Sequence, residues 1–399
     1  MIACVASLLL PAIWIVDAQM GPGAQFADLP AAIAAAANGD TILVRAGTYT
    51  GFYSNGKAVT VRGEGRTSTR IVGQQVGPAA HVVNTGGTFV LSGLRLEGGN
   101  PALLLLNATI ELLDCDLVGA AGPGQGGPGI VINDADVIAA RCTFLGGSAT
   151  GQLVAAGGDG ARVAGGSVLV ADQCWFLGGD VPGTSPVTQF AGRGVFCGGR
   201  ARLDGCRARG GNGLLISGAG VEAGVTAIVR ITGDATSYVA AGFSGGQLGS
   251  ALRNIGGTIV RHDPVAVVGG VFGTVAVGQP VPRLLVDGAA RADGTLDALQ
   301  PVQVTLDGVV PNGFGFVAFG EPVFAPPSPP FATELQLGGA GSVVFVTPLD
   351  ATGRAQFAYT PAAIGGPLVG VPVHLQGGAW SPVLGSVLTS NLAVHIAVP

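Results

Sequence analysis

This chain of 399 residues is poor in charged and aromatic side chains and has no long apolar run after residue 16. Charged residues make up 11% of the sequence and aromatic residues 6%. A helical membrane span needs about 20 consecutive apolar residues, so we expect no such span in the mature chain. The 19 basic residues are outnumbered by 24 acidic ones, which excludes the basic excess of a general nucleic-acid binder. Intrinsic disorder is excluded because 48% of the residues are hydrophobic.

Glycine, by contrast, is abundant, with 70 residues. Its usual share of a protein is about 7%. Each glycine inside a helix costs about 1 kcal/mol relative to alanine, so the sequence disfavours long helices. The glycines follow no strict three-residue period, which excludes a collagen triple helix. An all-β, turn-rich protein remains.

Residues 1–18 have the pattern of a secretory signal peptide. Their apolar stretch ends in Val16-Asp17-Ala18, with Val16 and Ala18 at the −3 and −1 positions of a cleavage after Ala18. No Lys or Arg stands at the start, which leaves a misassigned start codon or a buried first strand as alternatives. The pattern predicts a secreted or cell-surface protein.

Internal repetition is the strongest feature of the chain. Four ten-residue segments align without gaps around a cysteine, and a fifth carries Leu94 in its place: Phe89–Gly98, Ile110–Gly119, Val137–Gly146, Leu169–Gly178 and Ala201–Gly210. Successive anchor residues are 21, 27, 32 and 32 positions apart. Repeats of this length are typical of solenoids.

Apolar residues within each repeat identify the kind of solenoid. They recur with period two, and the alternation restarts after a two-residue corner such as Leu113-Asp114. A strand, a tight corner, a second strand and a glycine-rich loop form one coil of a parallel β-helix. Three inward columns are predicted: Phe89/Ile110/Val137/Leu169/Ala201, Leu91/Leu112/Ala139/Ala171/Leu203 and Leu96/Leu117/Phe144/Phe176/Ala208.

The N-terminal part supports this fold. The segment Phe26–Ala37 predicts a short capping helix, and Thr41–Arg45 the first strand. The stretch Leu29–Phe52, followed by VTVRGEG at Val59–Gly65, resembles the beginning of the pectin-lyase-like, right-handed parallel β-helix superfamily. The resemblance implies a right-handed β-helix, here assigned to residues 19–279, in a secreted bacterial protein that is either non-catalytic or divergent. The superfamily contains polysaccharide lyases and glycoside hydrolases as well as non-catalytic surface proteins.

Composition changes near Pro280. Fifteen of the 25 prolines and no cysteine lie from Pro280 onward. Short apolar runs separated by Gly and Pro predict a C-terminal β-sandwich over residues 280–399, for capping or attachment. Its expected strands are Val302–Leu306, Ser342–Thr347, Ala355–Tyr359, Val371–Gln376 and Leu392–Val398, with a stiff loop at Pro326–Pro330.

Four cysteines share one inward position of the repeat: Cys115, Cys142, Cys174 and Cys206. Coil spacing permits disulfides between neighbours, but parallel side chains in a column favour a ladder of buried thiols. The cysteines have no CxxC pairing and no nearby histidine, so the sequence predicts no metal site and no cofactor.

The outward positions predict a ligand-binding face. One row contains Arg95, Asp116, Thr143, Trp175 and Arg207; a second contains Val90, Glu111, Ile138, Val170 and Arg202. Arg193, Arg200, Arg202, Arg207 and Arg209 add a local basic cluster. Indole rings stack on sugars and guanidinium groups bind carboxylates, so we expect Arg95, Asp116, Thr143, Trp175, Arg202, Arg207 and Arg209 to contact an acidic polysaccharide or cell-surface glycan. A merely solvated face is the alternative.

The sequence offers little support for catalysis. The corner position of Asp114 is followed in later repeats by Arg141, Gln173 and Gly205, so no ladder of acidic residues forms. The Asp-rich and Gly-His-Gly elements implied for a hydrolase of the superfamily are missing. We therefore favour a non-catalytic extracellular protein over a polysaccharide lyase or glycoside hydrolase.

Overall fold

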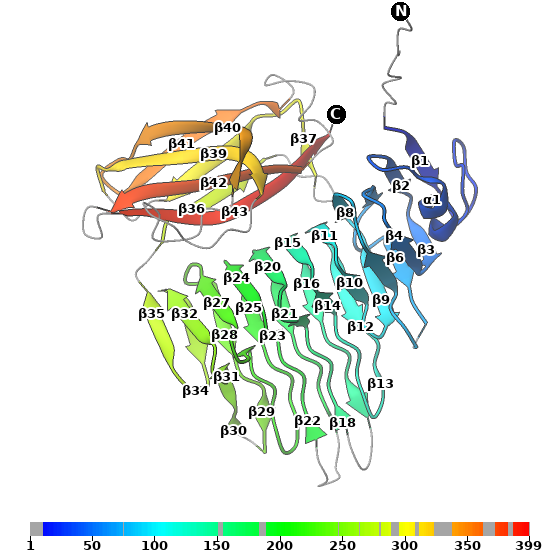
Figure 1. The fold of residues 1–399 in the computed structure, drawn as a ribbon, viewed down its shortest axis with the longest axis horizontal. Coiled ribbons are helices and arrows are strands. Elements are labelled where there is room, and N and C mark those ends of the chain that lie inside the picture. The colour runs from blue at the N-terminus through cyan, green and yellow to red at the C-terminus, as the bar shows by residue number, and fades with distance from the viewer. Residues whose placement is uncertain are drawn as a thin grey trace, which may run out of the picture.

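The computed structural model describes residues 11–74, 76–150, 155–182, 189–245, 247–262, 264–278, 281–288, 295–307, 311–322, 337–361, 372–381 and 386–398. In these residues the chain forms three parallel sheets stacked into a β-helical solenoid, one short helix, and C-terminal mixed and antiparallel sheets (Figure 1). The predicted fold class is confirmed. Within the same ranges, no helix has the length and apolarity needed to cross a membrane.

Each coil passes through the three sheets in the order A, B, C. Sheet A contains β1 (Ile13–Val16), β2 (Thr41–Val44), β5 (Thr60–Gly63), β8 (Thr88–Ser92), β11 (Thr109–Leu113), β15 (Asp136–Ala140), β20 (Val168–Asp172), β24 (Arg200–Asp204), β27 (Ile228–Thr232), β32 (Thr258–His262) and β35 (Val275–Gly278). Sheet B contains β3 (Gly47–Thr50), β6 (Thr69–Val72), β9 (Arg95–Gly99), β12 (Asp116–Gly119), β16 (Thr143–Leu145), β21 (Trp175–Leu177), β25 (Arg207–Arg209), β28 (Tyr238–Ala240) and β33 (Ala266–Val268). Sheet C contains β4 (Phe52–Asn55), β7 (Ala80–Val83), β10 (Leu103–Leu106), β14 (Ile130–Asn133), β19 (Ala161–Val163), β23 (Val195–Cys197), β26 (Val221–Ala223), β31 (Ser250–Asn254) and β34 (Gly270–Phe272).

The three predicted inward columns are confirmed by the strand register. Ile110 lies opposite Phe89 and Val137, and the Leu112 and Leu117 columns continue in the same way. The members of these columns are at most 4% exposed. The ring centroids of Phe144 and Phe176 lie 4.8 Å apart in a stacked arrangement, so each coil completes the core packing of the coil beside it.

The corner between sheets A and B has the same backbone shape in successive coils. Asp114, Arg141 and Gln173 have φ values of 51°, 54° and 52°, in the left-handed region. This conformation is uncommon outside glycine, and it turns the chain within one residue. The second corner, between sheets C and A, uses Asn84 and Asn107 in the same conformation, and the Asn107 side-chain amide donates to Asn84 Oδ1 at 3.1 Å.

Glycine-rich loops between sheets B and C form a second stacked layer, the glycine fin (residues 119–128, 146–160, 178–194, 210–220 and 241–250 where described). The fin projects from the solenoid and contains the short pairs β13 (Gly122–Pro123) with β17 (Ala149–Thr150), β18 (Ala155–Ala156) with β22 (Gln189–Phe190), and β29 (Phe243–Ser244) with β30 (Gln247–Leu248) (Figure 1). At its base, backbone hydrogen bonds alternate between the two arms of the fin, which are the first and the second halves of the successive loops. Gly147 N donates to Gly127 O at 2.8 Å, Gly158 N to Gly147 O at 2.9 Å, and Gly179 N to Gly158 O at 2.8 Å. A Cβ on Gly147 would overlap the carbonyl oxygen of Ala120, which explains the requirement for glycine.

The N-terminal end of the solenoid is closed by helix α1 (Leu29–Ala35), inside the expected segment. Asp28 caps its first turn, and Leu29 and Ile33 are buried against the first coils. Lys57 Nζ donates to the carbonyl oxygens of Ile33, Ala34 and Ala36 at 2.6–2.7 Å, which satisfies the end of the helix.

Strand β1 lies within the segment that the signal-peptide prediction assigns to a removable leader. It pairs in parallel with β2, and the indole of Trp14 donates to Asp40 at 2.9 Å. Asp17 is buried and pairs with Arg45 at 2.8 Å. The structure thus gives Ile13–Val16 the place of a first strand, while cleavage after Ala18 stays a prediction.

The C-terminal residues form a three-stranded and a five-stranded sheet. The first contains β36 (Arg283–Asp287), β38 (Val302–Asp307) and β41 (Arg354–Tyr359); the second contains β37 (Leu296–Asp297), β43 (Ser386–Val398), β42 (Pro372–Ser381), β39 (Phe314–Pro322) and β40 (Leu337–Pro348). All five expected strands overlap observed ones; β36, β37 and β39 were not predicted. The loop Pro326–Pro330 lies outside the described residues. Leu284, Val304 and Leu306 meet Val317 and Leu375 in a core between the sheets.

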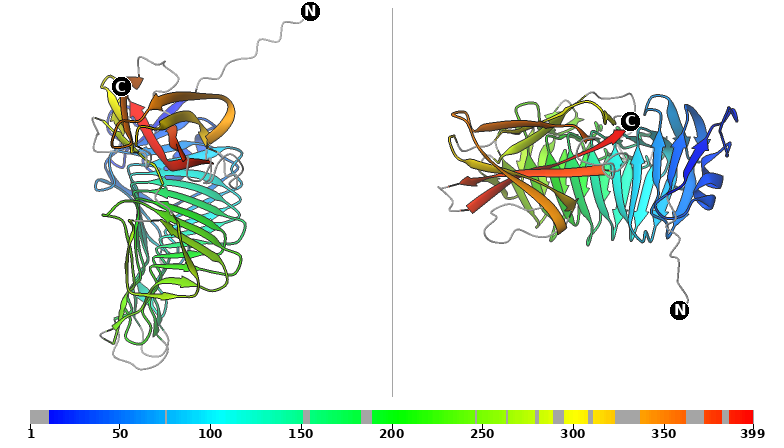
Figure 2. Two further views of the ribbon diagram at one scale, coloured as in Figure 1. Left: turned by 90° about the vertical axis from the view of Figure 1, so that its left-hand side faces the viewer. Right: turned by 90° about the horizontal axis from the view of Figure 1, so that it is seen from above.

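These C-terminal sheets pack on the outer face of sheet A (Figure 2). Ile138 and Val170 of the solenoid share a buried cluster with Leu392, Val394 and Ile396 of β43. The middle of the outer face of sheet A is therefore an internal surface of the protein, whereas the outer faces of sheets B and C stay open to a ligand.

Candidate functional site

The outward row predicted for ligand binding is a continuous column on sheet B. Arg95 lies opposite Asp116, Asp116 opposite Thr143, and Thr143 opposite Trp175, which in turn lies opposite Arg207. Phe176 points into the core, so strand alternation turns Trp175 outward, where 41% of it is exposed. The structure thus brings all five side chains onto one face.

The cations on this face differ along the column. Arg70 and Arg95 both pair with Glu97, and Arg66 lies 3.5 Å from Asp116. Burial by itself would raise the pKa of Glu97, but the hydrogen bonds from the two arginines outweigh it and lower this pKa. The early coils therefore offer guanidinium groups that are already neutralised.

The later coils offer guanidinium groups without a carboxylate partner among the described residues. Arg207 Nε donates to the carbonyl oxygen of Thr236 at 3.2 Å, and Arg209 to the amide oxygen of Asn212 at 3.2 Å. Both strand positions are beside Trp175 and Leu177 of the preceding coil. An aromatic face and two such cations thus lie within two neighbouring coils.

A groove of about 320 Å³ runs beside this cluster, between sheet B and the base of the glycine fin. Its floor is the column Val118, Leu145, Leu177 and Arg209, one residue from each of four coils. Because the coils stack along the solenoid axis, the groove crosses the strands and follows that axis. Asp180 and Arg209 are the ionisable side chains that line it. Such a channel suits an extended chain with apolar faces and acidic groups.

The prediction that Arg202 lies on this exposed face is wrong. Arg202 is 3% exposed, its Nε lies 2.7 Å from Asp204 Oδ2, and its guanidinium also donates to the carbonyl oxygen of Ser390. Its whole row lies beneath the C-terminal sheets, with Val90, Glu111, Ile138 and Val170 equally buried. The outward orientation was correct, but the second sheet layer covers it.

The basic cluster in the sequence is likewise not one surface patch. Arg200 and Arg202 belong to sheet A, whereas Arg207 and Arg209 belong to sheet B. Arg193 lies just before β23 of sheet C. It pairs with Asp159 and Glu222 at 2.8–2.9 Å, and its guanidinium stacks 4.2 Å from the centre of the Phe196 ring. Seventeen consecutive positions turn through all three faces, so nearness in sequence is not nearness in space.

The four repeat cysteines form the predicted column of buried thiols. The backbone N–H groups of Cys115, Cys142 and Cys174 each donate to the sulfur of the next cysteine along, at 3.4 Å. No disulfide joins them or Cys197. Burial raises the pKa of the Cys115 and Cys174 thiols, which makes them poor nucleophiles. Among the described residues no three His, Cys, Asp or Glu side chains are arranged to hold a metal ion.

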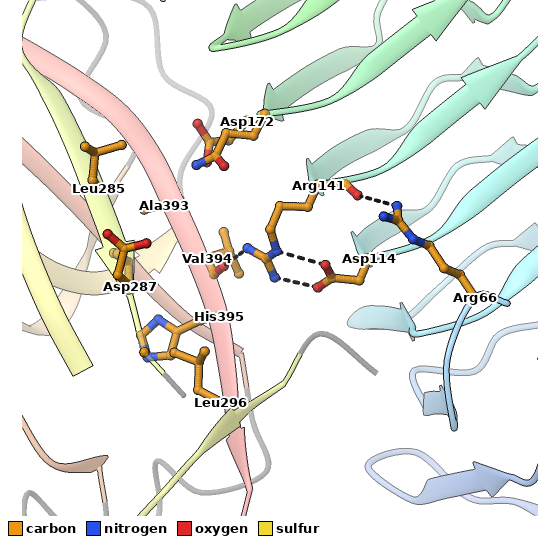
Figure 3. A pocket seen from close by; sticks show the side chains of 13 residues that line it. Arg66, Asp114, Arg141, Asp172, Leu285, Asp287, Leu296, Ala393, Val394 and His395 are labelled. Atoms are coloured by element: carbon orange, nitrogen blue, oxygen red, sulfur yellow. Dashed lines mark hydrogen bonds and ion pairs between the residues drawn. The ribbon is translucent and has the colours of Figure 1, made fainter. Parts of the chain in front are cut away.

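A cavity of about 390 Å³, which the sequence did not predict, lies between the solenoid corner and the C-terminal sheets (Figure 3). Its polar lining comes from both parts of the chain: Arg66, Asp114, Arg141, Asp172, Gln173, Asp287 and His395. Arg141 binds both oxygens of Asp114, at 2.9 and 2.6 Å, and donates to Val394 O at 3.2 Å. The repeat marks Asp114 and Arg141 as corner residues, but nothing local indicates a partner strand some 250 positions away.

Burial shifts the pKa values of Asp114 and His395, which both line this cavity. Burial raises the pKa of Asp114, and Arg141 only partly opposes that effect. Burial, with smaller contributions from Arg141 and His374, lowers the pKa of His395 to about 3. His395 is therefore neutral near pH 7, with Nε2 2.6 Å from the Tyr359 hydroxyl.

Compared with known proteins, the chain matches no family model, no curated protein and no solved structure.

Proposed function

We propose that this chain is a secreted, non-catalytic bacterial surface or matrix protein of the pectin-lyase-like, right-handed β-helix superfamily, which binds acidic polysaccharide along sheet B. The observation that carries the proposal is the exposed Trp175 beside Arg207 and Arg209, next to a groove that crosses four coils. The indole stacks on a sugar ring and the guanidinium groups bind its carboxylates. Thr143, Asp116 and Arg95 extend the contact toward the earlier coils, and Arg202 has no part in it.

Binding of uronic-acid oligomers to paired variants tests this assignment. Trp175→Ala and the double variant Arg207→Ala/Arg209→Ala should each weaken binding about tenfold or more. Trp380→Ala and Arg354→Ala are matched controls, because these side chains are 47% and 56% exposed on the C-terminal sheets. The controls should bind like the parent. Equal binding by the sheet B variants would overturn the site.

The chemical class of the ligand has its own test. Binding through guanidinium and carboxylate groups weakens with added salt because exposed charges are screened. We expect the affinity for acidic oligomers to fall between low and physiological ionic strength, and neutral oligomers of equal length to bind much more weakly. Equal affinity for neutral oligomers would contradict an acidic ligand, but it would not contradict binding in the groove.

The alternative, a polysaccharide lyase or glycoside hydrolase, is favoured by one observation. Asp114, Asp172 and Asp287 line one cavity, and burial raises the pKa of Asp114 toward that of a general acid. Incubation with acidic polysaccharides, followed by absorbance of unsaturated products and by new reducing ends, separates the two functions. Product formation that Asp114→Asn abolishes would replace the binding proposal.

Secretion is tested by the N-terminal sequence of protein recovered outside the cell. Asp40 is 5% exposed while β1 covers it, and a cut after Ala18 would remove both β1 and the hydrogen bond from the Trp14 indole to Asp40. A secreted form that begins before residue 12 would retain the strand. Protein found only inside the cell would contradict the proposed location.

A further inference from the structure

The two ends of the solenoid are finished differently. Helix α1 covers the N-terminal end, whereas the three sheets end at the other side in β33, β34 and β35, each of which pairs along one edge only within the part of the chain that the structure describes. The C-terminal sheets lie on the outer face of sheet A (Figure 1). The last coil therefore presents three open sheet edges.

The hydrophobic core is also open at this end. The inward Leu252 is 1% exposed, but Val271, next in its column, is 54% exposed. The column of Ile231 continues through Arg261, whose guanidinium donates to the carbonyl oxygen of Val265 at 2.7 Å, and ends in Val277, which is 62% exposed. Phe272, Phe243 and Leu248 of the last coil and the fin extend this apolar surface, since each is 44–57% exposed.

The last three strands carry none of the usual protection of a sheet edge. Their sequences are AVV, GVF and VAVG, without charge and without proline. Exposed edges are ordinarily blunted by lysine, proline or a covering element, because an unprotected edge pairs with another chain. An apolar, uncharged end with three open edges has the character of an interface.

We propose that this end, the tail face (β33, β34, β35 and the adjoining Phe243 and Leu248), binds the tail face of a second copy of this chain. A single strand from another protein would pair with one edge and leave two open. A second end coil continues the coil-on-coil packing on all three sides and covers the exposed valines. At the N-terminal end of another copy, α1 packs across the first coil, so a head-to-tail contact could reach the exposed edge of β1 but could not continue the packing on all three sides. A two-fold arrangement makes the facing strands antiparallel and closes the assembly at two copies.

Molar mass in solution tests the proposal. The full chain, measured by light scattering over a range of concentrations, should reach twice the 39.2 kDa of one copy. Val271→Arg and Val277→Arg should each halve that mass. Leu106→Arg, a matched control at a 44% exposed position of sheet C, should remain dimeric. A parent that stays monomeric, an arginine variant that stays dimeric, or a mass that grows without limit would each overturn the proposal.

Hydrogen exchange keeps the test valid where an arginine variant fails to fold. On concentrating the parent protein, amides in residues 266–278 should gain protection, while the exposed edge of β1 stays unchanged. Dimerisation without added protection in the last coil would place the interface elsewhere and overturn the tail face.

Discussion

Arg141 and Asp114 occupy the same corner position on successive coils, and the guanidinium of one binds both carboxylate oxygens of the other, at 2.9 and 2.6 Å. Their side chains are 33% and 16% exposed, and Arg141 also reaches Val394 O of strand β43. One side chain thus joins two coils and the C-terminal sheet.

Replacing Arg141 by methionine should lower the free energy of unfolding by about 1–3 kcal/mol, because it leaves the Asp114 carboxylate in a mostly buried place without its counter-charge. Chemical denaturation measures the change. Arg354→Met, which breaks the exposed pair with Asp307, serves as control and should cost less than about 1 kcal/mol. Equal losses for the two variants would contradict the structural role of the corner pair.

Stability should fall as the pH is lowered through the titration range of His395. Its folded pKa is about 3 because of burial, whereas an unfolded histidine has a pKa of 6.5, so the unfolded state takes up the proton first. The stabilisation is complete above pH 6.5 and is lost as the pH falls toward 3. Between pH 8 and pH 5 the loss amounts to about 2 kcal/mol.

His395→Gln isolates this contribution, since glutamine does not titrate. The difference in unfolding free energy between parent and variant should shrink steadily from pH 8 to pH 5. Parallel pH profiles would show that His395 does not titrate as its burial requires.

Gly147→Ala should destabilise the protein by about 1–3 kcal/mol, because the added methyl group overlaps the carbonyl oxygen of Ala120 at the base of the fin. Gly86→Ala is the matched control, since a Cβ there meets no atom within 4 Å. Thermal unfolding compares the two variants. A Gly147→Ala chain as stable as the control would mean that the arms of the fin are more loosely joined than the hydrogen bonds imply.

The thiols of Cys115, Cys142, Cys174, Cys197 and Cys206 should be unreactive until the protein unfolds, because all five are buried and none of them forms a disulfide. In a Cys4→Ser chain, a thiol reagent should detect none of them before denaturation and all five after it. Fewer than five thiols in the denatured, unreduced protein would reveal a disulfide and contradict the ladder.

The repeat was enough to predict the solenoid core. Period-two alternation fixes which side chains face inward, and gap-free alignment fixes which of them stack, so Ile110 and Val137 could be placed in one column. The same reasoning placed Trp175 and Arg207 side by side. Both results depend only on register, which the sequence repeats directly.

The repeat could not predict that the C-terminal sheets cover sheet A, because this packing depends on contacts between residues far apart in the chain. A trace of it is visible in hindsight: Val90, Ile138 and Val170 are apolar at outward positions of a strand, where solvent favours polar residues. The interdomain cavity left no such trace, because Asp287 and His395 join the solenoid corner only through tertiary packing.

Strand β43 has a mechanical consequence for the whole solenoid. It accepts hydrogen bonds from Arg202 at Ser390 and from Arg141 at Val394, which belong to coils two turns apart. A stack held only by nearest neighbours frays from its ends, one turn at a time. Here hydrogen bonds to the same strand, β43, hold the middle coils together, so these coils must open together. Unfolding that starts at either end of the solenoid should therefore stop when it reaches them.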